Sequence, residues 1–397
     1  MKILLSITLL MSIMAAWALP VQALELSGDV SVEGRLFAKD ELYNDQKRNN
    51  GSIAFEPEFY HEWSSSTDFS FTFVPFFRVD STDSERTHVD IRELNFLMVG
   101  NPWELRVGIG KVFWGVTEFV HLVDIINQTD LVEDIDGEDK LGQPMVHFSY
   151  FGDWGVVDFF LLPYFRERTY PGKEGRLRPP VKVDTDNAEY ESGAEESHID
   201  LALRYSQTYD WGDLGIYYFR GTSREPILIP SFKKPVLLPF YDQIDQVGLD
   251  LQLVFGNWLW KLESLYRDGT DDNFWAATGG FEYTFVSISD TMMDLGLITE
   301  YSYDDRDDDA TTPFQNDLLF GLRLGLNDAA STELLAGISF DLDDSGSVLQ
   351  IEASRRLTDN LKISLEAWSF FDLEESQTYL YSIRDDDFVR LQLFYYF

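Results

Sequence analysis

Apolar and polar residues alternate along most of the chain in runs of about ten residues. In one run Val247, Leu249 and Leu251 take every second place, and Asp250 and Gln252 stand between them. Comparable runs occupy 53–63, 69–79, 318–326, 349–356 and 361–366. Successive side chains of a β-strand point to opposite faces, so this period predicts strands with one apolar and one polar face. We therefore predict an all-β chain.

Short and long links alternate between these runs. The short links are 64–68, 100–103, 152–155, 208–213, 256–257, 287–291, 327–331 and 358–360; the longer, mostly charged links are 40–50, 80–87, 114–144, 166–197, 221–242, 268–273, 304–316, 342–347 and 372–386. This alternation is typical of a membrane barrel, and runs of about ten residues suffice for a tilted strand to cross a bilayer. We predict a transmembrane antiparallel β-barrel of about 18 strands, with short periplasmic turns and long acidic outer loops.

A soluble up-and-down barrel is the alternative architecture. The chain carries 31 Phe, 19 Tyr and 10 Trp, and outward apolar strips on so many strands could not all remain in water. Trp103, Trp154, Trp211 and Trp258 lie at short links. Their position fits an aromatic girdle at one membrane interface, which favours the membrane barrel.

The first 23 residues have the pattern of a secretory signal peptide. Lys2 precedes an apolar stretch, and Val21 and Ala23 are suitable for cleavage after Ala23. We expect residues 1–23 to be removed and residues 24–397 to form the barrel. After Ala23 no apolar stretch reaches the length of about 18 residues that a spanning helix needs. The chain has no cysteine, which excludes disulfides and thiolate metal sites.

The chain is strongly acidic, with 69 Asp and Glu against 31 Lys and Arg and a formal net charge of −38. Such a charge repels nucleic acid, so no nucleic-acid partner is expected. The expected partners are outer-membrane lipid and lipopolysaccharide, a hydrophilic solute and the barrel assembly machinery. Acidic outer loops suggest one mode of contact, bridging to lipopolysaccharide phosphates through divalent cations. We predict no cofactor.

The link 114–144 is the candidate constriction of the barrel lumen. Phe119, Leu122, Val123 and Ile126 follow helical spacing after Thr117, which predicts a short helix with an apolar face. Burial of that face favours an inward course, and an exposed acidic loop is the alternative.

Charged residues of this link and of the strands are the candidate pore-lining set. The acids are Glu118, Asp124, Asp130, Glu133 and Asp134, and the wall arginines are Arg35, Arg78, Arg92, Arg106 and Arg204. One hypothesis is an acidic loop that faces an arginine-bearing wall across the pore, so that the field selects what passes. The alternative is that lumen Arg and Glu side chains simply pair across strands.

The segment around this link resembles known outer-membrane proteins. "LRVGIGKVFWG", after "IRELNFL" and a tight turn, resembles the early hairpin of Gram-negative barrels of the alginate-export and related porin-like families, over Ile91 to Gly115. The similar features are an Arg-Glu pair in one strand, an L-R-x-G strand and a Trp-Gly that leads into a long inward loop. The resemblance implies transport of an anionic sugar or polysaccharide.

No catalytic motif is evident. His147 and Ser149 share one strand face, but the sequence assigns no third group to orient them, and GxSxG and HExxH motifs are absent. We predict a non-enzymatic protein.

The chain ends on the aromatic run "VRLQLFYYF". Val389, Leu391, Leu393, Tyr395 and Phe397 occupy one strand face, which we predict to be the lipid face of the last strand. The spacing resembles the C-terminal signal that outer-membrane barrels present to their assembly machinery. The overall prediction is a porin-like channel of the outer membrane, and a closed, non-conducting barrel with a structural or surface-binding role is the alternative.

Overall fold

A computed structural model describes residues 24–63, 68–269, 273–310 and 312–397, and the predicted signal peptide lies outside this range. The strands are β1 (Glu25–Phe37), β2 (Asn49–Trp63), β3 (Asp68–Asp80), β4 (His88–Val99), β5 (Trp103–Gly110), β6 (Gln143–Gly152), β7 (Gly155–Leu162), β8 (Glu189–Tyr190), β9 (Asp200–Tyr209), β10 (Gly212–Thr222), β11 (Ile227–Pro230), β12 (Leu237–Tyr241), β13 (Gln243–Phe255), β14 (Trp258–Asp268), β15 (Asn273–Phe285), β16 (Asp294–Asp304), β17 (Asn316–Gly325), β18 (Glu333–Asp341), β19 (Ser347–Arg356), β20 (Leu361–Phe371) and β21 (Phe388–Tyr396). In the described part of the chain the links hold one short α-helix, α2 (Thr378–Ser382), and four 3-10 turns, η2 (Thr185–Asn187), η3 (Glu195–Ser197), η4 (Ile288–Asp290) and η5 (Asp307–Asp309).

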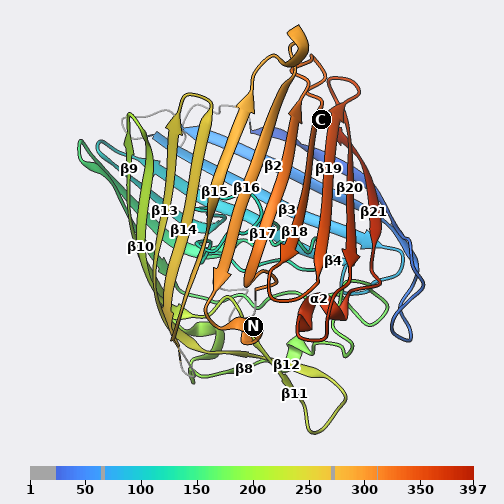
Figure 1. Ribbon diagram of the computed structural model, residues 1–397. Helices are drawn as coiled ribbons and strands as arrows, with labels where there is room; N and C mark the ends of the chain where they lie inside the picture. The colour runs from blue at the N-terminus through green and yellow to red at the C-terminus, as the bar shows by residue number, and fades with distance from the viewer. Residues whose placement is uncertain (1–23, 64–67, 270–272, 311) are drawn as a thin grey trace.

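An 18-stranded antiparallel sheet closes on itself to form a barrel (Figure 1). Each strand pairs with the next strand of the sheet along the chain, and β21 pairs with β1, with Arg390 opposite Arg35. Closure leaves no free edge of the sheet to pair with another chain. The predicted antiparallel barrel and its strand number are confirmed.

The alternation of the sequence separates the two faces of the wall. Outward apolar residues such as Val247 and Leu391 are 50% and 49% exposed. Polar residues on the inward face, such as Glu263 and Glu300, are 0% and 1% exposed. On the last strand the outward set is Val389, Leu391, Leu393, Tyr395 and Phe397. The outward surface is therefore apolar, as a membrane-embedded wall requires.

The links divide between two ends of the barrel, which we call the short-turn end and the long-loop end. The short-turn end holds both Glu25 and Tyr396, and its described turns follow the predicted short links. Among the described turns, three have only two residues: 153–154, 210–211 and 256–257. In the last of these Gly256 has φ +61°, which glycine adopts without steric cost. Residues 64–67 and 270–272 of two predicted links lie outside the described residues.

The long-loop end carries additional structure. The strands β8, β11 and β12 form a separate small sheet there, and α2 lies at the same end (Figure 1). Among the described residues no helix is long and apolar enough to cross a membrane.

Candidate functional site

Residues 111–142 link β5 to β6, and we call this link the lumen segment. Its residues Val123, Ile126 and Asp130 are 0%, 1% and 0% exposed. Burial to this degree requires the surrounding barrel wall, because the link has no sheet of its own to cover it. The lumen segment therefore folds into the barrel, the inward of the two courses that the sequence allowed.

The predicted helix in this segment is wrong. Residues 117–126 form bends and turns, and Thr117 does not cap a helix. Its hydroxyl lies 2.5 Å from the carbonyl oxygen of Val120 and 2.7 Å from Oε1 of Glu263. The N–H of Val123, which would bond within a helix that starts at Thr117, is bonded by a carboxylate of the wall instead.

Two buried glutamates of the wall hold the first half of the segment, and we call them the glutamate clamp. They are Glu263 on β14 and Glu300 on β16. Glu263 accepts hydrogen bonds from the backbone N–H groups of Val116 (2.6 Å), Thr117 (2.9 Å) and Val123 (3.2 Å), and Glu300 from those of Glu118 (2.8 Å) and Phe119 (3.2 Å). Hydrogen bonds to a charged acceptor are stronger than neutral ones, so the clamp fixes the backbone of this half.

Side chains next to the clamp extend these contacts to neighbouring strands. Glu118 lies 3.2 Å from Nζ of Lys261 on β14 and also forms an ion pair with Arg323 on β17. The ring of Phe119 lies against Gly337 on β18, where an added Cβ would stand 2.3 Å from the ring. The glycine thus provides the space into which the lumen segment packs.

The same half packs by apolar contact on the adjoining strands β6, β7, β9, β10 and β13. The buried cluster comprises Trp114, Val123, Ile125 and Ile126 of the segment with Met145, Phe160, Leu162, Ala202, Tyr217, Phe219 and Ile244 of the strands. Arg204 lies over the Trp114 ring at 4.8 Å and forms a bidentate ion pair with Asp250 (2.6 and 2.8 Å). Arg204 therefore supports the segment instead of facing an open passage.

The second half of the segment is acidic and lies against an arginine-bearing wall. Asp130 pairs with Arg92 (2.6 Å), Glu133 with Arg78 (2.6 Å) and Asp134 with Arg390, and Arg35 donates to the carbonyl oxygen of Glu133 (2.9 Å). All four arginines come from β1, β3, β4 and β21. The barrel closure between β21 and β1 brings them to one side of the lumen.

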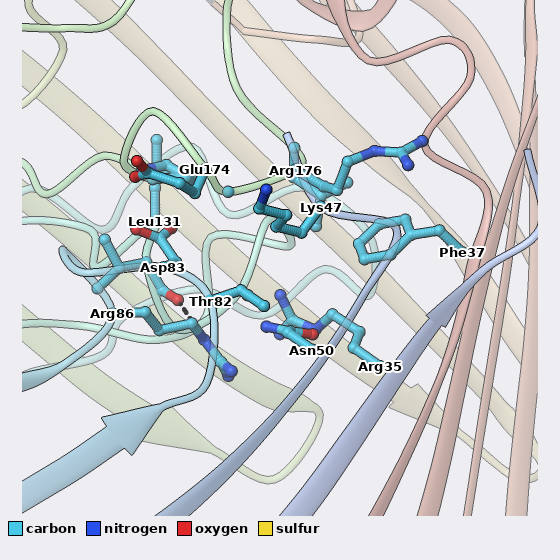
Figure 2. Close-up of a pocket in the computed structure, with 14 residues that line it drawn as sticks. Arg35, Phe37, Lys47, Asn50, Thr82, Asp83, Arg86, Leu131, Glu174 and Arg176 are labelled. Carbon is cyan, nitrogen blue, oxygen red and sulfur yellow. Dashed lines mark hydrogen bonds between the residues drawn. The ribbon is translucent and has the colours of Figure 1, made fainter. Parts of the chain in front are cut away.

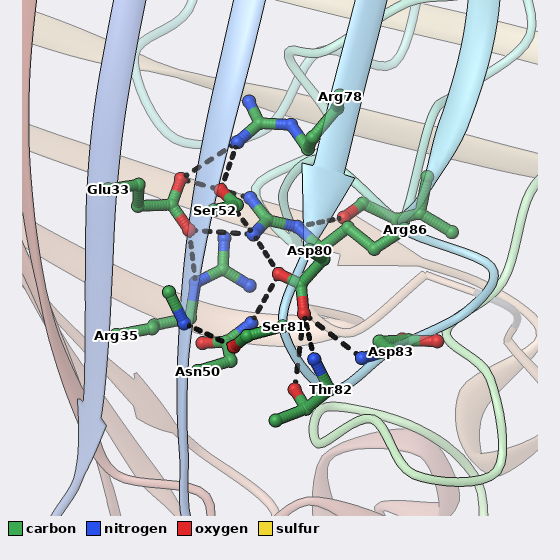
Figure 3. Close-up of polar contacts among 12 residues, drawn as sticks. Glu33, Arg35, Asn50, Ser52, Arg78, Asp80, Ser81, Thr82, Asp83 and Arg86 are labelled. Carbon is green, nitrogen blue, oxygen red and sulfur yellow. Dashed lines mark hydrogen bonds and ion pairs between the residues drawn. The ribbon is translucent and has the colours of Figure 1, made fainter.

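Glu33 of β1 lies at the centre of this charged group (Figure 3). It binds both terminal nitrogens of Arg86 (2.7 and 2.9 Å) and also approaches Arg78 (3.4 Å). Arg86 belongs to the link between β3 and β4, and its Nε donates to the carbonyl oxygen of Val132 (2.8 Å). The lumen segment is thus attached to the link as well as to the strands.

These distances change the hypothesis of a field across the pore. Arg35, Arg78 and Arg92 are 5%, 6% and 5% exposed and bind the segment directly, so no open gap separates them from its acids. Arg106 differs, because among the described residues it forms no hydrogen bond or ion pair with the segment, and its Nε is buried without a hydrogen-bond partner. The structure therefore brings four of the five predicted wall arginines into contact with the segment or its support, and it leaves Arg106 apart.

Two further groups brace the segment internally. Asp124 accepts hydrogen bonds from the N–H groups of Trp114 (2.6 Å) and Gly115 (3.0 Å). His121 lies 3.5 Å from Glu138 and 3.9 Å from Glu263. Burial opposes its positive charge, but the attraction of Glu138 and Glu263 outweighs burial and raises the pKa of His121 to about 10.

Links of the long-loop end cover the segment, and we call 163–199 and 372–387 together the cap. Thr169 of the first link donates to Asp130 (2.6 Å), and Arg176 joins the two links through Asp386 (2.5 Å). Between the cap and the wall remains a cavity of about 20 Å³ near Arg35, Arg86 and Arg176 (Figure 2), room for about one water molecule.

A second polar cluster lies on the wall at β6 and β7. Asp158 supplies a third group beside His147 and Ser149, which the sequence had not identified. However, Nε2 of His147 faces both Asp158 (2.8 Å) and Ser149 (3.1 Å), and the Ser149 hydroxyl donates to Asp158 (2.5 Å). A catalytic triad needs both ring nitrogens, one for each partner, so this arrangement is not a triad.

Among the described residues, one group of three His, Asp and Glu side chains has atoms close enough together to share a metal ion. His88, Asp130 and Glu133 each offer an atom within 4.8 Å of the others. Arg92 and Arg78 already neutralise the two carboxylates, so the geometry fits a structural ion-pair network better than a metal centre.

Comparison with solved structures agrees with this architecture. Pseudomonas aeruginosa OccD3 (OpdP) superposes with a TM-score of 0.51 over 94% of this chain and 90% of that chain, at 10% sequence identity. The chain folds as a porin-type barrel. A variant of the Rh. blastica porin gives a TM-score of 0.47 at 12% identity, over 94% of this chain and all of that chain. No family model matches the sequence, and no curated protein matches it either.

Several residues that hold the segment in this porin-type barrel were not predicted. Glu263 and Glu300 are mid-strand charges on the polar face, a signal that was visible in the sequence but did not reveal their partners. Arg86 lies in a link, where charge is expected anyway. Their partners are backbone groups far along the chain, and no sequence pattern indicates such contacts.

Proposed function

We propose that this porin-type barrel is a passive channel of the outer membrane for hydrophilic solutes, and that the lumen segment controls its passage. The observation that carries the proposal is a closed barrel of 18 strands whose polar inner wall holds an inward segment by noncovalent contacts. Barrels of about this size enclose an aqueous channel unless a segment fills it.

Outer-membrane residence rests on the apolar outer wall and on the last strand. We also propose that the barrel contacts outer-membrane lipid, and that its acidic outer loops contact lipopolysaccharide. Val389 to Phe397 are the proposed contact with the assembly machinery. Passive passage needs no chemical step and no cofactor.

The solute class is a narrower proposal. The resemblance around Ile91 to Gly115 suggests an anionic sugar or polysaccharide, for which arginines in the lumen would be binding groups. Most of these arginines are already paired with acids, so support for this class is weaker than support for hydrophilic passage in general.

A closed barrel is the second candidate function. It is favoured by the contacts of the lumen segment with β14 to β18 on one side and with β1, β3, β4 and β21 on the other, beneath the cap. In this alternative the barrel is a structural or surface-binding element.

Conductance measurements in planar bilayers distinguish the channel from the closed barrel. The channel proposal predicts discrete conductance steps for the purified wild-type protein and swelling of proteoliposomes in isotonic neutral sugars. A protein that inserts, as shown by heat-modifiable gel mobility, but never conducts at any voltage would support the closed barrel.

A further inference from the structure

Two buried carboxylates face each other near the long-loop end of the barrel. Asp317 on β17 is directly opposite Asp341 on β18. Asp317 is 3% exposed and Asp341 is 9% exposed. Two like charges at adjacent positions repel, and burial strengthens the repulsion unless a proton or a cation compensates. Among the described residues no Lys, Arg or His forms an ion pair with either carboxylate.

The hydrogen bonds of the two carboxylates differ. Asp341 accepts bonds from the N–H groups of Asp343 and Asp344, both at 2.9 Å, and from the side-chain amide of Gln377 at 2.6 Å. In contrast, Oδ2 of Asp317 is buried and has no hydrogen-bond partner in the described part of the chain. A buried anionic oxygen without a partner is costly, and a site with such an atom requires an explanation.

The surroundings of Asp317 offer oxygen ligands. Ser302 on β16 is opposite Asp317, and Thr278 on β15 is opposite Ser302, so a polar row crosses four strands at this level. Both hydroxyl residues are 1% exposed, and Oγ1 of Thr278 has no hydrogen-bond partner in the described part of the chain. Carboxylate and hydroxyl oxygens are ligands for hard divalent cations and not for transition metals that prefer nitrogen or sulfur.

The sequence around Asp341 has a spacing known from calcium-binding loops. Asp341, Asp343, Ser345 and Gly346 stand at the intervals of an EF loop, but an EF loop lies between two helices. Here the residues form the β18–β19 hairpin, and Glu352, the last residue of the motif, lies further along β19 opposite Leu335. On the neighbouring strand Asp317 is directly opposite Asp341 and offers the second carboxylate.

We propose that Asp317 and Asp341 bind one hard divalent cation, Ca²⁺ or Mg²⁺. The cation bridges β17 and β18 and neutralises the buried pair. Since Asp341 also holds Gln377, which immediately precedes α2, the bound cation ties the cap to the barrel wall. This role goes beyond solute passage and does not depend on it.

The test is the thermal stability of the folded barrel in detergent, with EDTA or with millimolar CaCl₂ or MgCl₂, at moderate NaCl to screen exposed acids. We expect either divalent salt to raise the melting temperature of the wild type. Asp317→Asn should lose this response and should melt above the wild type in EDTA, because the substitution removes one of two repelling charges. Isothermal titration of the folded wild type should show a site for Ca²⁺ that Asp317→Asn lacks.

The matched control is Asp372→Asn, which removes an exposed acid from the cap at the same end of the barrel and should keep the cation response. The proposal is overturned by a wild type that does not respond to divalent salt, or by an Asp317→Asn variant that responds as the wild type does. A third result also overturns the proposal: acidification stabilises the wild type, and Ca²⁺ and Mg²⁺ do not. That result would mean that Asp317 and Asp341 share a proton and do not bind a cation.

Discussion

Glu263 and Arg78 hold opposite halves of the same lumen segment by different chemistry. Glu263 is a buried acceptor for backbone N–H groups, so it fixes the course of the chain whatever side chains the segment carries. Arg78 binds a side chain, Glu133, and shares Glu33 with Arg86. In both cases a charge is removed from water, and its desolvation is offset only if its partners stay in place.

Arg78→Ala is expected to lower the free energy of unfolding by about 3–5 kcal/mol, because it leaves the Glu133 carboxylate buried without its main partner. Urea unfolding of the barrel in lipid vesicles measures the change. Arg106→Ala is the matched control on the same side of the wall and should cost far less, since among the described residues Arg106 forms no hydrogen bond or ion pair with the segment. Equal losses for the two variants would contradict the direct pairing of Arg78.

His121→Gln tests the charge at the centre of the segment. The folded pKa of about 10 lies above the ordinary value of 6.5, so the charged ring stabilises the fold fully below pH 6.5 and loses its effect as the pH rises through 10. The stability difference between wild type and variant should therefore be largest near pH 6, about 1–3 kcal/mol for bonds to charged groups, and should shrink towards pH 10. A difference that does not change with pH argues against the ion pairs of His121.

At the scale of elements, the strands were predictable and the local conformation of the lumen segment was not. In each strand apolar and polar side chains alternate with a period of two, because one face meets lipid and the other meets the lumen. The alternation is clearest in β21. The lumen segment is the exception: Phe119, Leu122, Val123 and Ile126 fit helical spacing, yet the segment forms bends and turns, and Glu263 and Glu300 bond its backbone N–H groups. Local periodicity carries no information about acceptors placed 140 residues or more away along the chain.

Deletion of Phe397 tests the last strand as an element. The N–H of Phe397 bonds to the carbonyl oxygen of Gly28 (3.1 Å), and its ring lies 6.1 Å from that of Phe55. Loss of these contacts removes an anchor at the seam between β21 and β1, and we expect the level of heat-modifiable barrel in the outer-membrane fraction to fall. If the deletion leaves this level unchanged, the result contradicts the assembly role. The control is Val286→Ala, which shortens another exposed apolar side chain at the short-turn end and so tests loss of lipid contact alone.

At the scale of the whole molecule, closure of the barrel creates the site. Arg390 of β21 and Arg35 of β1 are 355 positions apart in sequence yet directly opposite in the sheet, and both reach the lumen segment. The sequence predicted the barrel, its two unlike ends and the acidic inward link, because each of these follows from local pattern and charge. It could not predict that the arginines bind the acids directly, since this depends on how far the segment crosses the lumen and on the cap that covers it.

The glutamate clamp offers the most direct test that the lumen segment controls passage. Single-channel conductance in planar bilayers should be compared for the wild type, for Glu263→Ala with Glu300→Ala, and for Glu333→Ala, a matched control that removes an exposed glutamate near the short-turn end of β18. The double substitution leaves at least five backbone contacts without their acceptor, so the segment should detach from β14 and β16. We predict a larger or more frequently open conductance for the clamp variant and wild-type behaviour for the control. A clamp variant that folds, inserts and conducts as the wild type does would contradict control of the passage by the lumen segment.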